Sequence, residues 1–282
     1  MESETLQSDS AVVVDGARDG LARQVWETAR SAWAESPKGG KDEALESALR
    51  TCAEAYPELL PGVFQRGIDS SRPAPEQRAF AGQLVRLAEH DPGQAADIYR
   101  ELVKRTDRKP GVVTAALGAV EMMRERDPDT FALLIAETKV VLGVESAEWK
   151  KARSLLFDGS HSGYAAHNVI EPALRSENEV VRRMTARHLL PELTTKAQYG
   201  REILDMIEDR LGQDDDSLTV RACVAHLPEV YDRRPGQARR IAESAYGHSI
   251  AVRETVVRAM TEAGMADKLP IGQGFSEDLR LV

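Results

Sequence analysis

The sequence predicts an all-α protein built from repeated helix pairs, and three observations support this fold class. Hydrophobic residues make up 42% of the chain and aromatic residues only 5%, while alanine, leucine, glutamate and arginine, which favour helices, dominate. Apolar residues recur at helical spacing along most of the sequence. The helical segments also recur with a period in the thirties, which is typical of stacked structural units.

Seven positions begin the first helix of each predicted unit. They lie at 45, 77, 113, 149, 181, 220 and 252, and the intervals between them are 32, 36, 36, 32, 39 and 32 residues. From Val220, for example, Val224 and Leu227 follow four and seven positions later, which places all three on one helical face. The unit that begins at Trp149 fits this pattern less well.

A proline marks the start of the second helix in three units. Pro92, Pro128 and Pro235 each lie fifteen residues after the start of the first helix. Proline suits the first turn of a helix, where its missing N–H is not needed. Neither helix can bury its apolar face alone, so neighbouring units must stack. We therefore predict a single right-handed α-α superhelix of about seven helical pairs.

The ends of the chain differ from this array. We expect a disordered acidic tail over 1–16, a capping helix and linker over 17–40, the repeat array over 41–265 and a C-terminal tail over 266–282. No segment approaches the roughly 18 apolar residues of a membrane span, so we expect a cytoplasmic protein with no membrane partner. Cys52 and Cys223 lie in apolar stripes and are expected to be reduced core residues.

Three helix starts share a motif. "SENEVVRRMTARHL", "DDDSLTVRACVAHL" and "GHSIAVRETVVRAM" each join a polar turn to Val-Arg and small apolar residues. This pattern resembles HEAT-like (armadillo-type) helical repeats over roughly 41–265. In such repeats the helix-start arginine pairs with an acidic residue in a neighbouring turn. The resemblance therefore implies a structural ladder of Arg78, Arg182, Arg221 and Arg253, although some of these arginines could instead face a ligand.

The fourth unit lacks the proline and carries "FDGSHSGYAAHN" instead. Asp158, His161 and Tyr164 in this polar connection could converge on a ligand, with Trp149 one helix earlier. The alternative is that Asp158 simply caps a helix. We predict no metal site, because His161 and His167 are six residues apart and not at the i, i+4 spacing of paired ligands.

Two arginine clusters are further candidates for binding a ligand or partner. One contains Arg182, Arg183 and Arg187, and the other contains four residues around the start of a second helix: Arg233, Arg234, Arg239 and Arg240. Arginine binds phosphate and carboxylate groups in bidentate fashion. Nineteen acidic residues nevertheless offset fourteen arginines and three lysines over 145–265. The clusters are thus either a paired, solvated surface or a basic ridge on the concave face.

The sequence contains no Gly-rich phosphate loop, nucleophile elbow or HExxH motif, so it disfavours an enzyme and implies no cofactor. Our first hypothesis is a noncatalytic scaffold or adaptor that binds a protein or peptide on its concave face. The alternative is a DNA-binding repair protein, because one branch of HEAT-like proteins consists of glycosylases that act on alkylated bases. "ENEVVRRM" is similar to that branch, with Asp158 as the candidate carboxylate. "ARHLLPEL", however, lacks the aromatic and arginine residues expected beside its proline.

Overall fold

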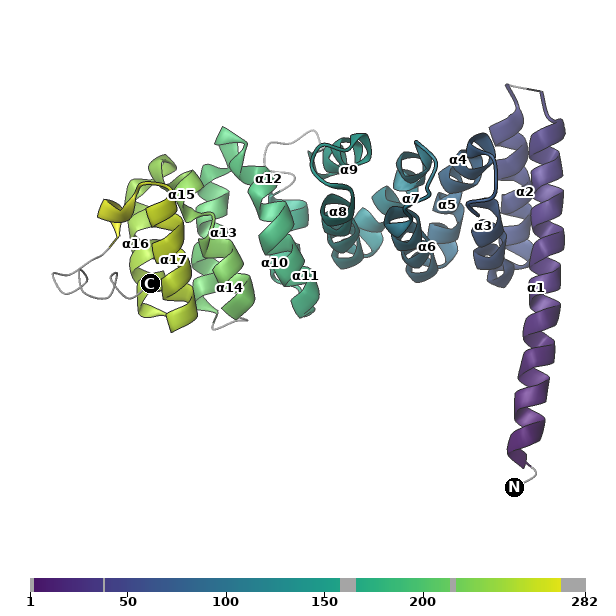
Figure 1. The fold of residues 1–282 in the computed structure, drawn as a ribbon, viewed down its shortest axis with the longest axis horizontal. Coiled ribbons are helices and arrows are strands. Elements are labelled where there is room, and N and C mark those ends of the chain that lie inside the picture. The colour runs from purple at the N-terminus through teal and green to yellow at the C-terminus, as the bar shows by residue number, and fades with distance from the viewer. Residues whose placement is uncertain (1–2, 38, 158–165, 214–216, 270–282) are drawn as a thin grey trace. The chain divides into compact units, whose positions relative to one another are not determined.

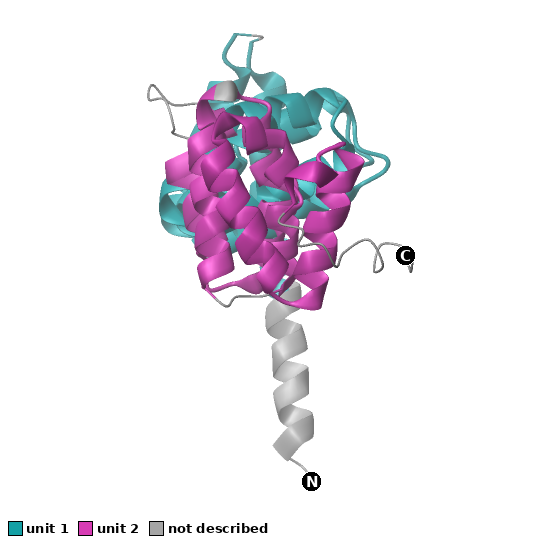
Figure 2. Cartoon of the chain, turned by 90° about the vertical axis from the view of Figure 1, so that its left-hand side faces the viewer, with its two compact units in different colours: residues 1–155 teal, residues 156–282 magenta. Residues whose placement is uncertain are grey.

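The structure is a computed structural model that describes residues 3–37, 39–157, 166–213 and 217–269. Every regular element in these ranges is a helix, which confirms the all-α class. The chain divides into two compact units, Met1–Leu155 and Leu156–Val282, which are coloured separately in Figure 2. None of the described helices is long and apolar enough to cross a membrane.

Unit 1 begins with one long helix that packs against the first helix pair (Figure 1). The elements of unit 1 are α1 (Ser3–Glu35), α2 (Lys41–Ala55), η1 (Pro57–Leu59), α3 (Leu60–Gly67), α4 (Ala74–Gly82), α5 (Leu84–His90), α6 (Pro92–Lys104), α7 (Val112–Arg126), α8 (Pro128–Leu142) and α9 (Ala147–Phe157), whose last two residues belong to unit 2. The capping helix expected over 17–40 lies in the second half of α1. There Trp26 is buried, with the Arg72 guanidinium 4.2 Å from its ring centroid.

The helices of unit 1 form two layers. The first helices α2, α5 and α7 contact one another in that order, and the second helices α3, α6 and α8 do the same. The predicted proline starts are confirmed, since α6 and α8 begin at Pro92 and Pro128. In both cases the preceding aspartate caps the helix: Asp91 accepts from the backbone N–H of Gln94, and Asp127 caps α8 in the same way.

Unit 2 repeats the two-layer arrangement, and two of its first helices are broken into shorter segments. Its elements are η2 (Ala166–Ile170), α10 (Glu171–Leu174), α11 (Glu179–Met184), η3 (Thr185–Leu189), α12 (Leu190–Thr194), η4 (Ala197–Tyr199), α13 (Gly200–Gly212), α14 (Ser217–Val224), α15 (Leu227–Val230), η5 (Tyr231–Arg233), α16 (Pro235–Gly247), α17 (Ile250–Glu262) and η6 (Ala266–Lys268). The start of α16 at Pro235 confirms the third proline prediction. Helices α11, α14 and α17 form one layer, and α13 and α16 pack together in the other.

Two prolines explain why the first helices of unit 2 are broken. Pro191 has no N–H for the carbonyl four residues earlier, at Arg187, and the helix widens there into the π-helical turn η3. Pro228 follows a similar break between α14 and α15, at Ala225 and His226. A basic residue lies at each break, Arg187 at the first and His226 at the second, and both line the same hollow. Cys52 and Cys223 are buried, as predicted, and neither forms a disulfide.

Candidate anion-binding site

A hollow of about 470 Å³ lies on the first-helix layer of unit 2. Five basic residues from three successive helix pairs line it: Arg183, Arg187, Arg221, His226 and Arg258. The rest of the lining is the buried Thr255 and three small or apolar residues, Leu218, Ala222 and Ala225. Among the residues that the structure describes, no acidic side chain lines it. This hollow, which we call the arginine hollow, is therefore suited to an anionic group.

Helical spacing and the proline breaks place these side chains. Arg183 and Arg187 are four residues apart on α11 and η3, so both project from the same side. Leu218 and Arg221 share a face of α14 in the same way. Arg258 comes from α17, three residues after Thr255. The contact of α14 with both η3 and α17 brings the three sets together.

Arg221 is held in position by a hydrogen-bond chain. Its Nε donates to Thr255 Oγ1 at 3.0 Å, and Thr255 Oγ1 donates to the carbonyl of Ala251 at 2.8 Å. Thr255 is 5% exposed, so this contact is shielded from water. The two terminal amino groups of Arg221 make no hydrogen bond or ion pair with a described residue. A guanidinium fixed by Nε offers these groups to a ligand at little entropic cost.

The other arginines differ in how far their charge is neutralised. Arg183 pairs with Glu179 one turn earlier. Arg187 and Arg258 are exposed, and neither makes an ion pair or hydrogen bond with a described residue. The charge of the hollow is therefore carried mainly by Arg187, Arg221 and Arg258.

His226 connects the arginine hollow to an acidic residue. Its Nδ1 lies 3.3 Å from Glu229 Oε1, so the ring N–H donates to the carboxylate. This hydrogen bond is the main reason that the pKa of Glu229 is lowered; burial opposes it, and a hydrogen bond from Thr194 adds to it. Glu229 therefore stays ionised at neutral pH.

A second hollow of about 350 Å³ adjoins the arginine hollow. The two share Ala225, Thr255 and Arg258 as a common wall. The second hollow adds Glu229 and Glu262 to its lining, and Glu262 is exposed without an ion pair to a described residue. We call it the glutamate hollow. The first-helix layer of unit 2 thus presents a basic and an acidic compartment side by side.

The arginine cluster near the start of α16 does not join this site. Arg239 pairs with Glu243 at 3.0 Å, and Arg240 approaches Glu208 at 3.9 Å. Arg233 and Arg234 are exposed, and the stem of Arg233 lies over Gly200. Charges of both signs therefore alternate on the second-helix layer of unit 2.

The residues predicted around the fourth unit are not assembled into a described site. Trp149 is 2% exposed and packs in the core of unit 1, with the Lys139 ammonium 5.6 Å from its ring centroid, so its ring offers no surface to a ligand. Asp158, His161 and Tyr164 lie outside the described residues.

Two of the four helix-start arginines bond just before their own helices: Arg182 donates to the carbonyls of Ser176 and Glu177, and Arg253 donates to the carbonyl of Tyr246. The other two reach the next unit, since Arg78 donates to the carbonyl of Pro110 and Arg221 donates to Thr255. Other arginines, which the sequence did not single out, bond from the end of one helix to the end of a helix in the neighbouring pair. Arg105 reaches the carbonyl of Ile68, Arg126 that of Glu89, and Arg210 that of Leu174. These bonds span 36 or 37 residues, close to the repeat period.

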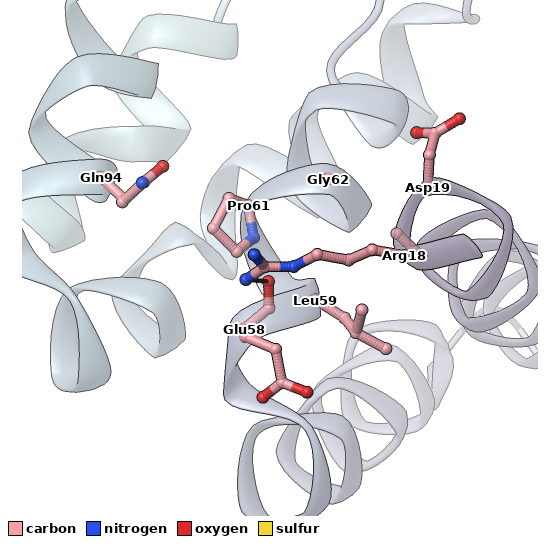
Figure 3. Close-up of a pocket in the computed structure, with 8 residues that line it drawn as sticks. Arg18, Asp19, Glu58, Leu59, Pro61, Gly62 and Gln94 are labelled. Carbon is pink, nitrogen blue, oxygen red and sulfur yellow. Dashed lines mark hydrogen bonds between the residues drawn. The ribbon is translucent and has the colours of Figure 1, made fainter. Parts of the chain in front are cut away.

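Unit 1 has a hollow of its own, about 250 Å³ in volume, but its charges hold the fold together. Figure 3 shows Arg18 reaching from α1 to the backbone at Glu58, whose carbonyl accepts its hydrogen bond at 2.8 Å. Asp19 on its rim pairs with Arg66 of α3. Both charges thus fasten α1 to η1 and α3, so this hollow is a weaker candidate for a ligand.

Sequence analysis found Arg183 and Arg187, assigned Arg221 a structural role and missed Arg258 and His226. A signal for the missed residues exists in the repeat itself. The sixth residue after the helix starts at 181, 220 and 252 is Arg187, His226 or Arg258, and it is basic in no earlier unit. A column of basic residues at one repeat position predicts a basic stripe across stacked helices.

No three His, Cys, Asp or Glu side chains in the described ranges gather as metal ligands. Comparison of the chain with family models, curated proteins and solved structures gives no match.

Proposed function

We propose that this protein is a noncatalytic, HEAT-like adaptor that binds an acidic segment of a partner protein in the arginine hollow of unit 2. The single observation that carries the proposal is the hollow itself, in which Arg187, Arg221 and Arg258 converge without a neutralising carboxylate among the described residues. The two oxygens of a carboxylate can accept two parallel N–H bonds from one guanidinium group. Several guanidinium groups around one hollow suit the binding of anionic side chains.

The repeat architecture supports the HEAT-like part of the proposal. Helix pairs recur with proline at the start of the second helix, and arginines link the ends of neighbouring pairs. We extend this to a right-handed superhelical arrangement of the pairs, as in other stacked repeats. The proposed binding surface lies on the first helices, whereas sequence analysis favoured a concave face.

The distribution of charge favours a protein segment over duplex DNA. DNA binding needs basic side chains spaced along a phosphate backbone. The arginines of α16 are instead matched by acidic groups, such as Glu208 beside Arg240, and Gln237 of α16 donates to both Asp205 and Glu208. The unneutralised positive charge that supports the proposal is confined to one hollow, which suits a few carboxylates.

The test is a fluorescence-anisotropy titration of the full chain against two labelled probes at about 50 mM and about 200 mM salt. One probe is a decapeptide with two adjacent glutamates, and the other is a duplex DNA. We expect the peptide to bind to the unmodified protein. The double variant with Arg187→Glu and Arg258→Glu should bind the peptide at least about tenfold more weakly. The matched control is Arg234→Glu with Arg239→Glu, which changes the charge equally on the second-helix layer and should leave the affinity unchanged.

Two outcomes would overturn the proposal. Tight, salt-sensitive binding of DNA with no binding of the peptide would favour the nucleic-acid alternative. Equal losses of affinity in the two double variants would show that net charge, and not the arginine hollow, attracts the peptide.

A further inference from the structure

The two adjoining hollows of unit 2 have opposite charge and a common wall. The arginine hollow carries Arg187, Arg221 and Arg258, whereas the glutamate hollow carries Glu229 and Glu262. Arg258 lines both. A segment that fills the first hollow would extend along this wall into the second, where a basic side chain would meet two carboxylates.

Helix α17 sets the distance between Thr255, which holds the Arg221 guanidinium, and Glu262 of the glutamate hollow. Thr255, Arg258 and Glu262 follow one another at i, i+3 and i+7, so they lie on one face of the helix. Seven residues of α-helix advance roughly 10 Å at about 1.5 Å per residue. An extended peptide advances about 3.3 Å per residue, so roughly three of its residues cover the same length.

Of the two carboxylates in the glutamate hollow, Glu262 is open to a cation, whereas Glu229 already accepts a hydrogen bond from His226. Glu262 is exposed and makes no ion pair with a described residue. The pKa of Glu229 is lowered, chiefly by its hydrogen bond with His226, so this carboxylate is ionised at neutral pH. Arg258 in the shared wall would pair with the acidic end of the segment and leave the two glutamates to its basic end.

We infer that the arginine and glutamate hollows form one docking groove for an extended, dipolar segment, in which an acidic side chain lies about three residues from a lysine or arginine. This inference rests on the proposed function, since the arginine hollow anchors the acidic end. It adds that the partner segment carries both charges at a fixed spacing. Like charges at that spacing would be disfavoured, which provides specificity.

The experiment uses three labelled decapeptides and the full chain at about 50 mM salt. All contain two adjacent glutamates. The first has lysine three residues after the pair, the second has lysine three residues before it, and the third has glutamine at both places. We expect one of the lysine peptides to bind about threefold to fivefold more tightly than the glutamine peptide, as for one partly exposed ion pair.

Variants of α17 locate the source of this gain. Glu262→Gln should abolish the advantage of lysine over glutamine while leaving the affinity for the glutamine peptide unchanged or slightly higher. Glu254→Gln is the matched control, because Glu254 is an exposed glutamate of the same helix that lines neither hollow. It should preserve the advantage.

The outcomes separate this inference from the function on which it rests. If no peptide binds, the proposed function fails and the groove fails with it. If all three peptides bind equally and Arg187→Glu with Arg258→Glu weakens all of them, the arginine hollow stands and the dipolar groove is refuted. An advantage of lysine that survives Glu262→Gln also refutes it.

Discussion

A buried hydrogen bond between the second helices of unit 1 gives a sharp test of the packing. Tyr99 of α6 and Thr138 of α8 are 1% and 0% exposed, and their hydroxyl oxygens are 2.9 Å apart. Thr138 Oγ1 also lies 2.7 Å from the carbonyl of Leu134, which can only accept. The single proton of Thr138 therefore goes to that carbonyl, and Tyr99 must donate to Thr138.

Because Tyr99 donates and Thr138 accepts, removing one hydroxyl should cost less stability than removing the other. Tyr99→Phe removes a donor but leaves Thr138 bonded to the Leu134 carbonyl, so it should cost about 1 kcal/mol. Thr138→Val removes the acceptor and leaves the Tyr99 hydroxyl buried without a partner, which should cost about 1–3 kcal/mol. Adding Tyr99→Phe to Thr138→Val should then recover part of that loss.

The assay is urea denaturation of the full chain followed by tryptophan fluorescence. All three tryptophans, Trp26, Trp33 and Trp149, belong to unit 1, so the signal reports on the unit that contains the mutations. A cost for Tyr99→Phe equal to or greater than that for Thr138→Val would refute the assigned direction. Additive losses in the double variant would refute it as well.

The pH dependence of the same pair provides a second measurement. Burial raises the pKa of Tyr99, and the hydrogen bond with Thr138 opposes this only in part. A phenol with a raised folded-state pKa stabilises the fold fully below the unfolded value of about 10 and loses this contribution as the pH rises further. The difference in stability between the wild type and Tyr99→Phe should therefore narrow above about pH 10. A constant difference across that range would contradict the burial argument.

Four further substitutions test other parts of the fold. Gly67→Ala places a methyl carbon 2.2 Å from the ring of a fully buried phenylalanine and should cost about 1–3 kcal/mol. Gly118 has open space around it, so Gly118→Ala should stabilise α7 by about 0.5–1 kcal/mol. Urea denaturation followed by tryptophan fluorescence compares the two variants. If Gly67→Ala and Gly118→Ala change the free energy of unfolding equally, the predicted clash at Gly67 is refuted. Arg210→Met removes the donor to the last carbonyl of α10 and should lower the free energy of unfolding by about 1–3 kcal/mol. Circular dichroism is the suitable measurement, because unit 2 has no tryptophan. Burial raises the pKa of Asp209, but hydrogen bonds from Arg210 and Arg175 outweigh it, so the pKa is lowered. The ionised carboxylate therefore stabilises the fold above about pH 4, and this contribution is lost as the pH falls. Asp209→Asn should accordingly make the free energy of unfolding less dependent on pH in the acid range.

Local chemistry explains why the helix pairs could be read from the sequence. An aspartate that accepts from the helix backbone, followed by proline at the first helical position, starts α6 and α8 wherever the chain lies in the fold. The apolar stripes are equally local, because helical spacing alone decides which side chains share a face. The repeat period follows from these signals together.

The arginine hollow depends on tertiary structure. The sequence places Arg183 and Arg187 on one helix turn, but it does not show that α17 brings Arg258 beside them or that Thr255 fixes Arg221. The sequence equally does not show that Glu208 approaches Arg240 of α16. Helical phase, and pairs such as Arg239 with Glu243, depend on neighbours three and four residues away. Arg258, which joins Arg221 in the hollow, and Glu208, which approaches Arg240, come from more than thirty residues away and are brought there by packing. For that reason the sequence by itself determined the repeating helix pairs, and only the packed layers decided which arginines share one hollow.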